Sequence, residues 1–299
     1  MIIETHNLTK RFGRTDAVNG VSLAVPEGAT VALVGANGAG KTTTLRMLAN
    51  LVRPDSGEAM VLGVDSRRLG PAEYARIGYV SENQKLPGWM RVDAFFAYLR
   101  PLYATWDTGL EDELRRSLDL PADRKIAHLS RGMRMKLSLA TALAFRPALL
   151  LLDEPLSALD PFVRNQVMSG LLASTEGATI LMSSHELTEI EGVATHLAFM
   201  AGGRILVQDT LEAAGRRFVD VTAGFAGDPD KAGAYERSWL SPRWSGRTLR
   251  FMTTAYGGDE SALRKDLTTR FGPLAHLSAA PLSLREISTA LIGAHREDQ

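Results

Sequence analysis

The sequence predicts an α/β fold with a mostly parallel sheet, because apolar strands alternate with helix-forming stretches and one strand carries no polar residue. From residue 1 to about 217, short apolar runs and helical stretches follow one another, which is typical of parallel strands with helices packed on the sheet. Residues 149–152 are all leucine, as expected of a strand that is buried on both faces. We therefore expect residues 1–217 to form one α/β domain and residues 218–299 a separate accessory domain.

The individual elements follow from the spacing of apolar residues. Strands are expected at residues 2–5, 29–34, 77–80, 148–153, 179–183 and 196–200. Helices are expected at residues 42–51, 92–103, 109–118 and 131–145. The last three of these helices fall within residues 84–146, which we interpret as a helical insertion in the α/β scaffold. Beyond residue 217 the pattern predicts a small α+β appendage without recognisable chemistry. Its expected strands are residues 219–222 and 248–252, and its expected helices are residues 260–271 and 284–292.

Composition limits the possible functions. The chain has 299 residues, 45% of them hydrophobic and 23% charged, a length that corresponds to about two domains. Its formal net charge is zero, which argues against a nucleic-acid partner, since nucleic-acid-binding domains carry a basic face. It contains no cysteine, which excludes disulfides, thiolate metal sites and cysteine nucleophiles. Neither a signal peptide nor an apolar run of the roughly 18–20 residues that span a membrane is visible, so we expect a soluble, cytoplasmic protein.

A glycine loop follows the strand expected at residues 29–34. It has the form G-x-x-x-x-G-K-T, in which the glycines let backbone N–H groups surround a phosphate chain. The residues expected to bind nucleotide here are Gly35, Asn37, Gly38, Ala39, Gly40, Lys41, Thr42 and Thr43. Lys41 supplies a positive charge for the terminal phosphates, and the Thr42 hydroxyl is suited to ligate Mg²⁺. A plain glycine turn is the alternative, but a turn requires neither the Lys-Thr pair nor the buried strand before it.

Four further segments follow this loop in order. They are Leu-Ser-Arg-Gly-Met at residues 129–133, Asp-Glu-Pro at 153–155, Ser-Ala-Leu-Asp at 157–160 and Ser-Ser-His-Glu at 183–186. With all five motifs in this order, the chain resembles the nucleotide-binding subunits of ABC transporters across residues 1 to about 217. The resemblance implies a P-loop NTPase of the ABC-cassette type, with a RecA-like core, an antiparallel β subdomain and a helical insertion. It also implies that the protein binds ATP and Mg²⁺ and hydrolyses ATP.

The resemblance assigns roles around the γ-phosphate. Asp153 would hold Mg²⁺ together with Thr42, and Glu154, at the position of the family's catalytic carboxylate, would polarise the attacking water. His185 matches the switch histidine that helps to position this water, and Lys41 completes the catalytic set. Both carboxylates stand at the end of a buried strand, which brings them to the edge of the sheet where the glycine loop begins.

Other matching positions imply a site that two chains share. Ser130 can cap the helix expected at residues 131–145, and in the family this serine and the amide of Gly132 face the γ-phosphate bound by the other subunit. Asp160 is expected at the contact between the subunits. The partner is then a second copy of the chain or a related ATPase subunit. Phe12 matches the aromatic residue that stacks on adenine, with an ordinary core phenylalanine as the alternative.

Two places depart from the family pattern. Arg131 and Met133 replace the third and fifth residues of the usual Leu-Ser-Gly-Gly-Gln signature. Arg131 is either a surface charge or an added positive charge near the phosphate bound by the other subunit. Glu82 occupies the place of the coupling-loop glutamine, and we include it among the expected Mg²⁺ ligands. Gln84, two residues later, is the alternative for this role.

The resemblance further implies an integral membrane permease as a partner, which would hold the chain at the inner face of the cell membrane. Trp89 and Met90, in an expected loop before the helical insertion, are candidates for the surface that meets this partner. The accessory domain and Glu82 favour an exporter. One alternative is a soluble ABC ATPase that acts as a regulatory or assembly factor. Another is a protein that binds ATP without hydrolysing it, and the presence of Glu154 and His185 argues against this alternative.

Overall fold

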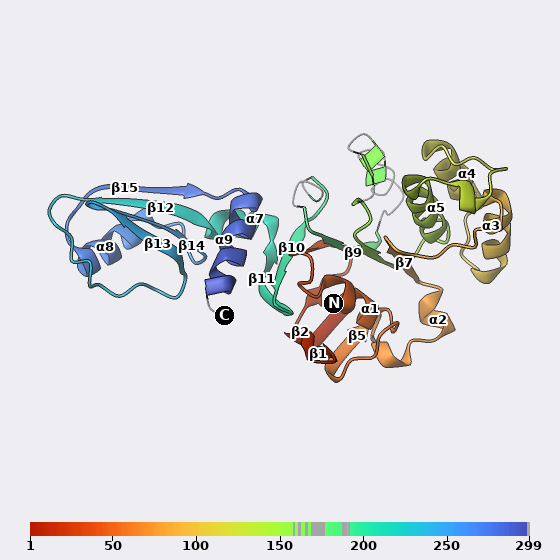
Figure 1. The fold of residues 1–299 in the computed structure, drawn as a ribbon, viewed down its shortest axis with the longest axis horizontal. Coiled ribbons are helices and arrows are strands. Elements are labelled where there is room, and N and C mark those ends of the chain that lie inside the picture. Colours follow the sequence, from red (N-terminus) through yellow and green to blue (C-terminus); the bar gives the residue numbers. More distant parts are fainter. Residues whose placement is uncertain are drawn as a thin grey trace. The chain divides into compact units, whose positions relative to one another are not determined.

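The computed structural model describes residues 1–157, 159–160, 163–164, 167–168, 177–186, 190 and 192–297. The chain divides into two compact units, Met1–Gln208 and Asp209–Gln299, both drawn in Figure 1. This division lies before the domain limit expected at residue 217, so that helix α7 (Leu211–Arg217) belongs to the second unit. No helix in the described part of the chain is long and apolar enough to span a membrane.

The centre of the first unit is a six-stranded sheet, in which the strands from β10 to β7 are parallel. Its order is β11 (Arg204–Thr210), β10 (His196–Ala201), β4 (Thr30–Val34), β9 (Thr179–Ser184), β8 (Leu149–Asp153) and β7 (Ile77–Ser81). Every residue of β4, β8 and β9 is buried. This sheet confirms the predicted α/β fold. Parallel strands end at one edge, and here Val34 pairs with Ser184 and Asp153 with Ser183.

A second, antiparallel sheet belongs to the same unit, as the family resemblance implies. Its strands are β1 (Ile3–Phe12), β2 (Thr15–Val21), β3 (Ala24–Val25), β5 (Ser56–Val61) and β6 (Val64–Asp65). The sequence pattern predicts only residues 2–5 of this sheet, because its strands keep one polar, exposed face. Two helices connect it along the chain to the central sheet, α1 (Lys41–Leu48) and the short α2 (Pro71–Tyr74).

Three helices form the predicted insertion and lie together beside β7 (Figure 1). They are α3 (Val92–Leu99), α4 (Thr108–Ser117) and α5 (Arg131–Leu143). Helix α3 ends before the predicted limit at residue 103, because Pro101 has no N–H group to continue an α-helix and the chain turns into a 3₁₀ segment. On α4, the buried carboxylate of Glu111 accepts hydrogen bonds from Arg100 at 2.7 and 2.8 Å and from Trp106 Nε1 at 2.9 Å. These bonds join α4 to the chain that leaves α3.

The second unit is built on a four-stranded antiparallel sheet in the order β13-β14-β12-β15. After α7 its elements are β12 (Val219–Phe225), β13 (Trp239–Ser245), β14 (Thr248–Thr253), α8 (Glu260–Phe271), β15 (Leu274–Pro281) and α9 (Leu284–Glu297). An aromatic core fills the space between one sheet face and α8, where the Trp239 and Phe251 rings stack with centroids 4.0 Å apart. The α+β architecture agrees with the prediction, but the sequence pattern does not predict β13, β15 or α7.

Candidate functional site

The glycine loop joins β4 to α1 and leaves the start of this helix open. Gly38 and Gly40 have φ angles of 83° and 107°, in the left-handed region that favours glycine. A Cβ atom on Gly35 would lie 2.1 Å from the carbonyl oxygen of Met200, so the loop has no room for a side chain there. Among the described residues no side chain caps α1, which leaves the N-terminal N–H groups of the helix available to an anion.

The remaining predicted loop residues belong to the same turn. Asn37 is exposed, Ala39 is buried and Thr43 is half-buried at the start of α1. The N–H of Gly35 donates to the carbonyl oxygen of Ser184 at 3.3 Å, which fixes the loop to the end of β9. The loop thus has the shape that its motif predicts, and its contacts with nucleotide stay a prediction.

Lys41 places a buried positive charge in the centre of the loop. Its side chain is 5% exposed, and Nζ lies 3.2 Å from Glu154 Oε1. Nζ also donates to the carbonyl oxygens of Gly35 at 2.7 Å and Ala36 at 3.3 Å. In this structure the loop lysine and the expected catalytic carboxylate therefore neutralise each other.

Asp153 stands at the end of β8, where its side chain contacts residues of α1 and β9. Its Oδ1 accepts hydrogen bonds from Thr42 Oγ1 at 2.8 Å and from Ser183 Oγ at 2.9 Å. A hydroxyl and a carboxylate oxygen side by side are the ligands that Mg²⁺ takes, usually together with oxygens of a bound phosphate. No group of three His, Asp or Glu side chains suited to a metal occurs among the described residues. Thr42 and Asp153 therefore fit a Mg²⁺ ion that phosphate oxygens help to hold.

Glu154 follows Asp153 with a backbone φ of 51°, a left-handed conformation that is rare outside glycine and common at functional sites. Its N–H donates to Ser183 Oγ at 3.0 Å, and its Oε2 lies 2.7 Å from Nδ1 of His185. The structure thus brings Lys41, Glu154 and His185 together, as expected. Ser183 was not predicted as a site residue, although it lies in the Ser-Ser-His-Glu motif directly before His185.

The residues expected at a second subunit lie at the surface of the first unit. Ser130 is exposed and caps α5, where its Oγ accepts a hydrogen bond from the N–H of Met133 at 3.1 Å. Gly132 is half-buried in the first turn of this helix. Asp160 is exposed, and its Oδ1 accepts from the N–H of Val163 at 3.0 Å. Ala158, in the same motif as Asp160, lies outside the described residues. The predicted helix cap at Ser130 is therefore confirmed, whereas the contacts with another subunit stay predictions.

The two departures from the family pattern meet in space. The Glu82 carboxylate, just after β7, forms an ion pair with the guanidinium of Arg131 at the start of α5. Gln84 is exposed and lines the same small cavity as this pair. The expected role of Glu82 as a Mg²⁺ ligand stays a prediction, and in this structure its charge is engaged by Arg131.

Two aromatic side chains from the sequence analysis are exposed. Phe12 at the end of β1 is 51% exposed, and Nζ of Lys10 lies 5.4 Å from its ring centroid. The alternative of an ordinary core phenylalanine is therefore wrong, and stacking on adenine stays a prediction. Trp89 is 74% exposed and Met90 is half-buried. Within the part of the chain that the structure describes, the tryptophan side chain is therefore accessible to a partner protein.

Comparison with known proteins identifies what this chain is similar to. The profile of the family described as "ABC transporter" matches residues 18–157. The bacitracin transport ATP-binding protein BcrA of Enterococcus faecalis is 34% identical over 212 residues, which cover 69% of this chain and 68% of the relative. The daunorubicin resistance ATP-binding protein DrrA2 of Streptomyces coeruleorubidus is 36% identical over 215 residues, which cover 70% of this chain and 66% of the relative. The match thus spans about two thirds of each relative.

A solved structure agrees with these relatives. It is a dimeric post-hydrolysis state of the ATP-binding cassette MJ0796 bound to ADP and Pi, with a TM-score of 0.60 and 25% sequence identity. The similarity covers 70% of this chain and 98% of the other. The fold around the glycine loop is therefore that of a cassette that has been observed with the products of ATP hydrolysis.

Proposed function

The chain belongs to the ABC transporter family of ATP-binding proteins, as an ATP-hydrolysing subunit, and we propose that its hydrolytic site is the cluster of Lys41, Thr42, Asp153, Glu154 and His185. One observation carries this assignment: at the edge where the glycine loop, β8 and β9 meet, Thr42 contacts Asp153, and Lys41 and His185 both contact Glu154. Ser183 joins the two groups, because it bonds both the Asp153 carboxylate and the Glu154 N–H. Charged groups that meet beside an open helix N-terminus suit phosphoryl transfer, in which catalysis consists mainly of positioning and electrostatic stabilisation.

Each side chain then has a separate task. Thr42 and Asp153 would hold Mg²⁺, which supplies charge stabilisation at the phosphate oxygens. Lys41 exchanges its contact with Glu154 for the terminal phosphates. The freed Glu154 carboxylate orients a water molecule and accepts its proton. His185, 2.7 Å from Glu154, keeps that carboxylate in place and reaches the side of the γ-phosphate.

We assign Ser130, Gly132 and Asp160 to a second site half, contributed by another copy of this chain or by a related ATPase subunit. Ser130 and Gly132 lie at the positive end of α5, which suits it to meet a phosphate. The dimer of the similar cassette supports this arrangement. Two chains joined head to tail would then close over two nucleotides.

For the whole assembly we propose a membrane permease as the partner, docked at the exposed Trp89. The permease would hold the chain at the inner face of the membrane. Export is the direction that we propose, on the grounds of the accessory domain and of Glu82 at the coupling position. Phe12, exposed on β1, is the assigned platform for adenine.

Substitution of Glu154 tests the hydrolytic site. Glu154→Gln keeps the size of the side chain but removes its basicity, so ATP hydrolysis should fall by about 10²- to 10⁴-fold, while equilibrium ATP binding persists. Steady-state phosphate release and nucleotide titration measure the two effects. Glu27→Gln, at an exposed glutamate of the same unit, should hydrolyse ATP at the wild-type rate. An equal absence of hydrolysis in wild type and Glu154→Gln would instead favour a protein that binds ATP without turnover. Equal measurable rates would contradict the catalytic role of Glu154.

A further inference from the structure

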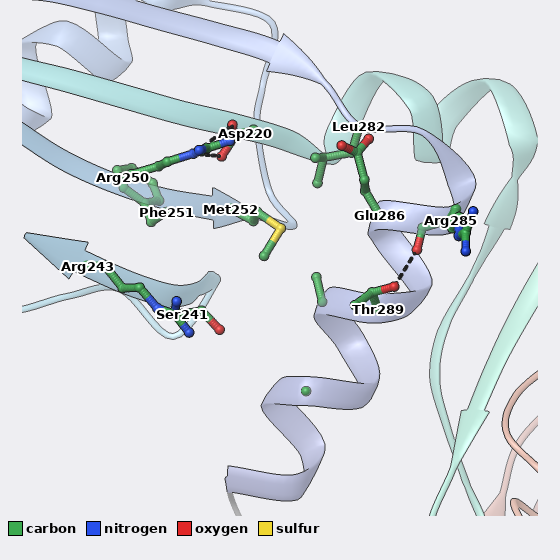
Figure 2. Close-up of a pocket in the computed structure, with 12 residues that line it drawn as sticks. Asp220, Ser241, Arg243, Arg250, Phe251, Met252, Leu282, Arg285, Glu286 and Thr289 are labelled. Carbon is green, nitrogen blue, oxygen red and sulfur yellow. Dashed lines mark hydrogen bonds and ion pairs between the residues drawn. The ribbon is translucent and has the colours of Figure 1, made fainter.

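The second unit contains a cavity of about 680 Å³ between its sheet and α9 (Figure 2). Its described lining residues all belong to this unit, on β12, β13, β14, α9 and the segment before α9. None of them belongs to the nucleotide cluster, so the cavity is a separate feature. Its volume is typical of sites for small molecules, which combine apolar walls with a few charged groups.

Apolar side chains form walls on both sides of this cavity. Met252 of β14 projects into the space between the sheet and α9 (Figure 2). Leu282 and Ala290 line the other side, where they are 8% and 4% exposed. A compact apolar group that enters this space would leave water, which is the main source of affinity for small ligands in such cavities.

Arg243 reaches the cavity because β13 contains a bulge. Arg243 pairs with Arg250 of β14, and the register shifts between Leu240 and Arg243. The extra residue lies next to Ser241, whose φ of 49° is left-handed and therefore unusual for serine. Without this bulge, the alternation of the strand would turn Arg243 toward the α8 face of the sheet. Bulges that re-aim a side chain are frequent beside functional sites.

The bulge also brings two like charges together on the solvent-exposed side of the cavity. Arg243 and Arg250 stand directly opposite each other, an arrangement that destabilises a sheet. Asp220 accepts from Arg250 at 2.7 and 3.1 Å, and Glu286 accepts from the Ser283 N–H and hydroxyl at 2.8 and 2.7 Å. Both acids in the lining are thus engaged, and no hydrogen bond or ion pair joins Arg243 to the residues that the structure describes. Three arginines and two acids among the described lining residues leave one net positive charge.

We propose that this cavity binds a small organic anion, with its carboxylate on Arg243 and its apolar body between Met252 and α9. A guanidinium offers two parallel N–H donors to a carboxylate, which gives both charge and direction. The anion would supply the counterion that Arg243 lacks and relieve the repulsion from Arg250. This site is independent of the proposed ATP site, and its test requires no nucleotide.

Calorimetric titration of the full chain with two matched probes tests the proposal. Naphthalene-2-carboxylate and naphthalene-2-carboxamide share one ring system, but only the first carries a charge. We expect the carboxylate to bind wild type at least about tenfold more tightly than the amide, because only the carboxylate pairs with the guanidinium. Arg243→Gln should weaken the binding of the carboxylate by about tenfold and leave the binding of the amide unchanged. Arg243→Lys should recover part of the lost affinity, because it restores the positive charge without the two parallel N–H donors of a guanidinium.

Arg247→Gln is the matched control. Arg247 lies in the same β13–β14 hairpin, pairs with Asp228 at 3.0 Å and does not line the cavity, so its loss should leave both affinities at their wild-type values. Thermal unfolding of each variant establishes that it is folded. Equal affinity for the two probes, unchanged carboxylate binding in Arg243→Gln, or absence of binding by either probe at millimolar concentration would each overturn the proposal.

Discussion

The ion pair between Glu82 and Arg131 joins the coupling loop to the signature motif, the two places at which this chain departs from its family pattern. Each departure is a single charge when read in the sequence, and the structure makes them partners across the loop after β7 and the start of α5. Arg131 adjoins Ser130, the residue assigned to the phosphate of the other subunit. The ion pair therefore keeps the Arg131 guanidinium beside Ser130, while the Glu82 carboxylate neutralises its charge.

Substitutions of Arg131 and of its partner Glu82 distinguish the two hypotheses for Arg131, a surface charge or a positive charge that acts on the phosphate bound by the other subunit. If Arg131 contributes to ATP binding, Arg131→Ala should raise the ATP KM about threefold, a factor within the roughly 0.2–1 kcal/mol of an exposed ion pair. Glu82→Gln, which keeps an oxygen ligand but frees Arg131, should lower KM by a similar factor. ATPase rates over a range of ATP concentrations give both values, with Arg116→Ala on α4 as the control. Unchanged KM in both variants would make Arg131 a surface charge only.

The types of residue and their order along the chain predicted most residues of the candidate site. The contacts between these residues, and the participation of Ser183, depend on which strands lie next to each other in the sheet. Asp153 and Glu154 were predictable because they end an all-leucine strand. The Lys41–Glu154 and Thr42–Asp153 contacts depend on which strands adjoin β8, and Ser183 joins the site only through the pairing of β9 with β8. One sequence does not reveal that pairing.

At the level of elements, burial on both faces decided which strands the sequence revealed. β4, β8 and β9 are buried throughout and were predicted nearly to their ends. β13 was missed because Pro242 and the bulge interrupt its alternation. Most of the antiparallel sheet, beyond the predicted residues 2–5, was missed because one face of its strands stays polar. Helix α8 was predicted at its observed bounds, with Asp259 capping its N-terminus through two N–H groups.

Glu111 provides a test of how the helical insertion is held together. Burial alone would raise the pKa of its carboxyl. Hydrogen bonds from Arg100 and Trp106, together with the charge of Arg100, outweigh this effect, so that the pKa lies below its ordinary value. Glu111→Gln should reduce the unfolding free energy by about 2 kcal/mol at neutral pH, because charge-assisted bonds are lost. Thermal unfolding of both proteins measures this difference.

The pH dependence of the same pair has a defined sign. A carboxyl with a depressed folded pKa stabilises the protein above its unfolded pKa of about 4.3, and this contribution disappears as pH falls through the folded pKa. The gap between wild type and Glu111→Gln should therefore be constant above about pH 5 and shrink below about pH 4. Glu113→Gln, exposed on the same helix, should show no such gap. A gap that stays constant into acid would contradict the account.

At the level of the whole molecule, one chain carries one glycine loop and one α5 N-terminus, so each proposed ATP site needs a second chain. Ser130→Asp tests this arrangement without removing the helix cap, since aspartate caps helices as well as serine does. The added charge should repel the phosphate of the other chain. In a Glu154→Gln background with ATP and Mg²⁺, light scattering should find dimers that Ser130→Asp converts to monomers.

Thr210→Asp is the matched control for this experiment. Thr210 caps α7, where its Oγ1 accepts from the N–H of Ala213 at 3.0 Å, so the same chemical change occurs at a helix cap in the second unit. This variant should still dimerise with ATP. Dimers that persist in Ser130→Asp would contradict the placement of α5 at the other chain's nucleotide.

The Lys41–Glu154 contact pairs the loop lysine with a carboxylate of the same chain. Any incoming anion must displace a carboxylate that is tethered to the same chain and therefore present at a high effective concentration. Inorganic phosphate or sulfate, with few contacts, should compete poorly against this tethered carboxylate. A triphosphate chain that also engages the loop amides and α1 makes enough contacts to succeed. We therefore expect Lys41 to exchange Glu154 for the terminal phosphates of a triphosphate more readily than for a single small anion.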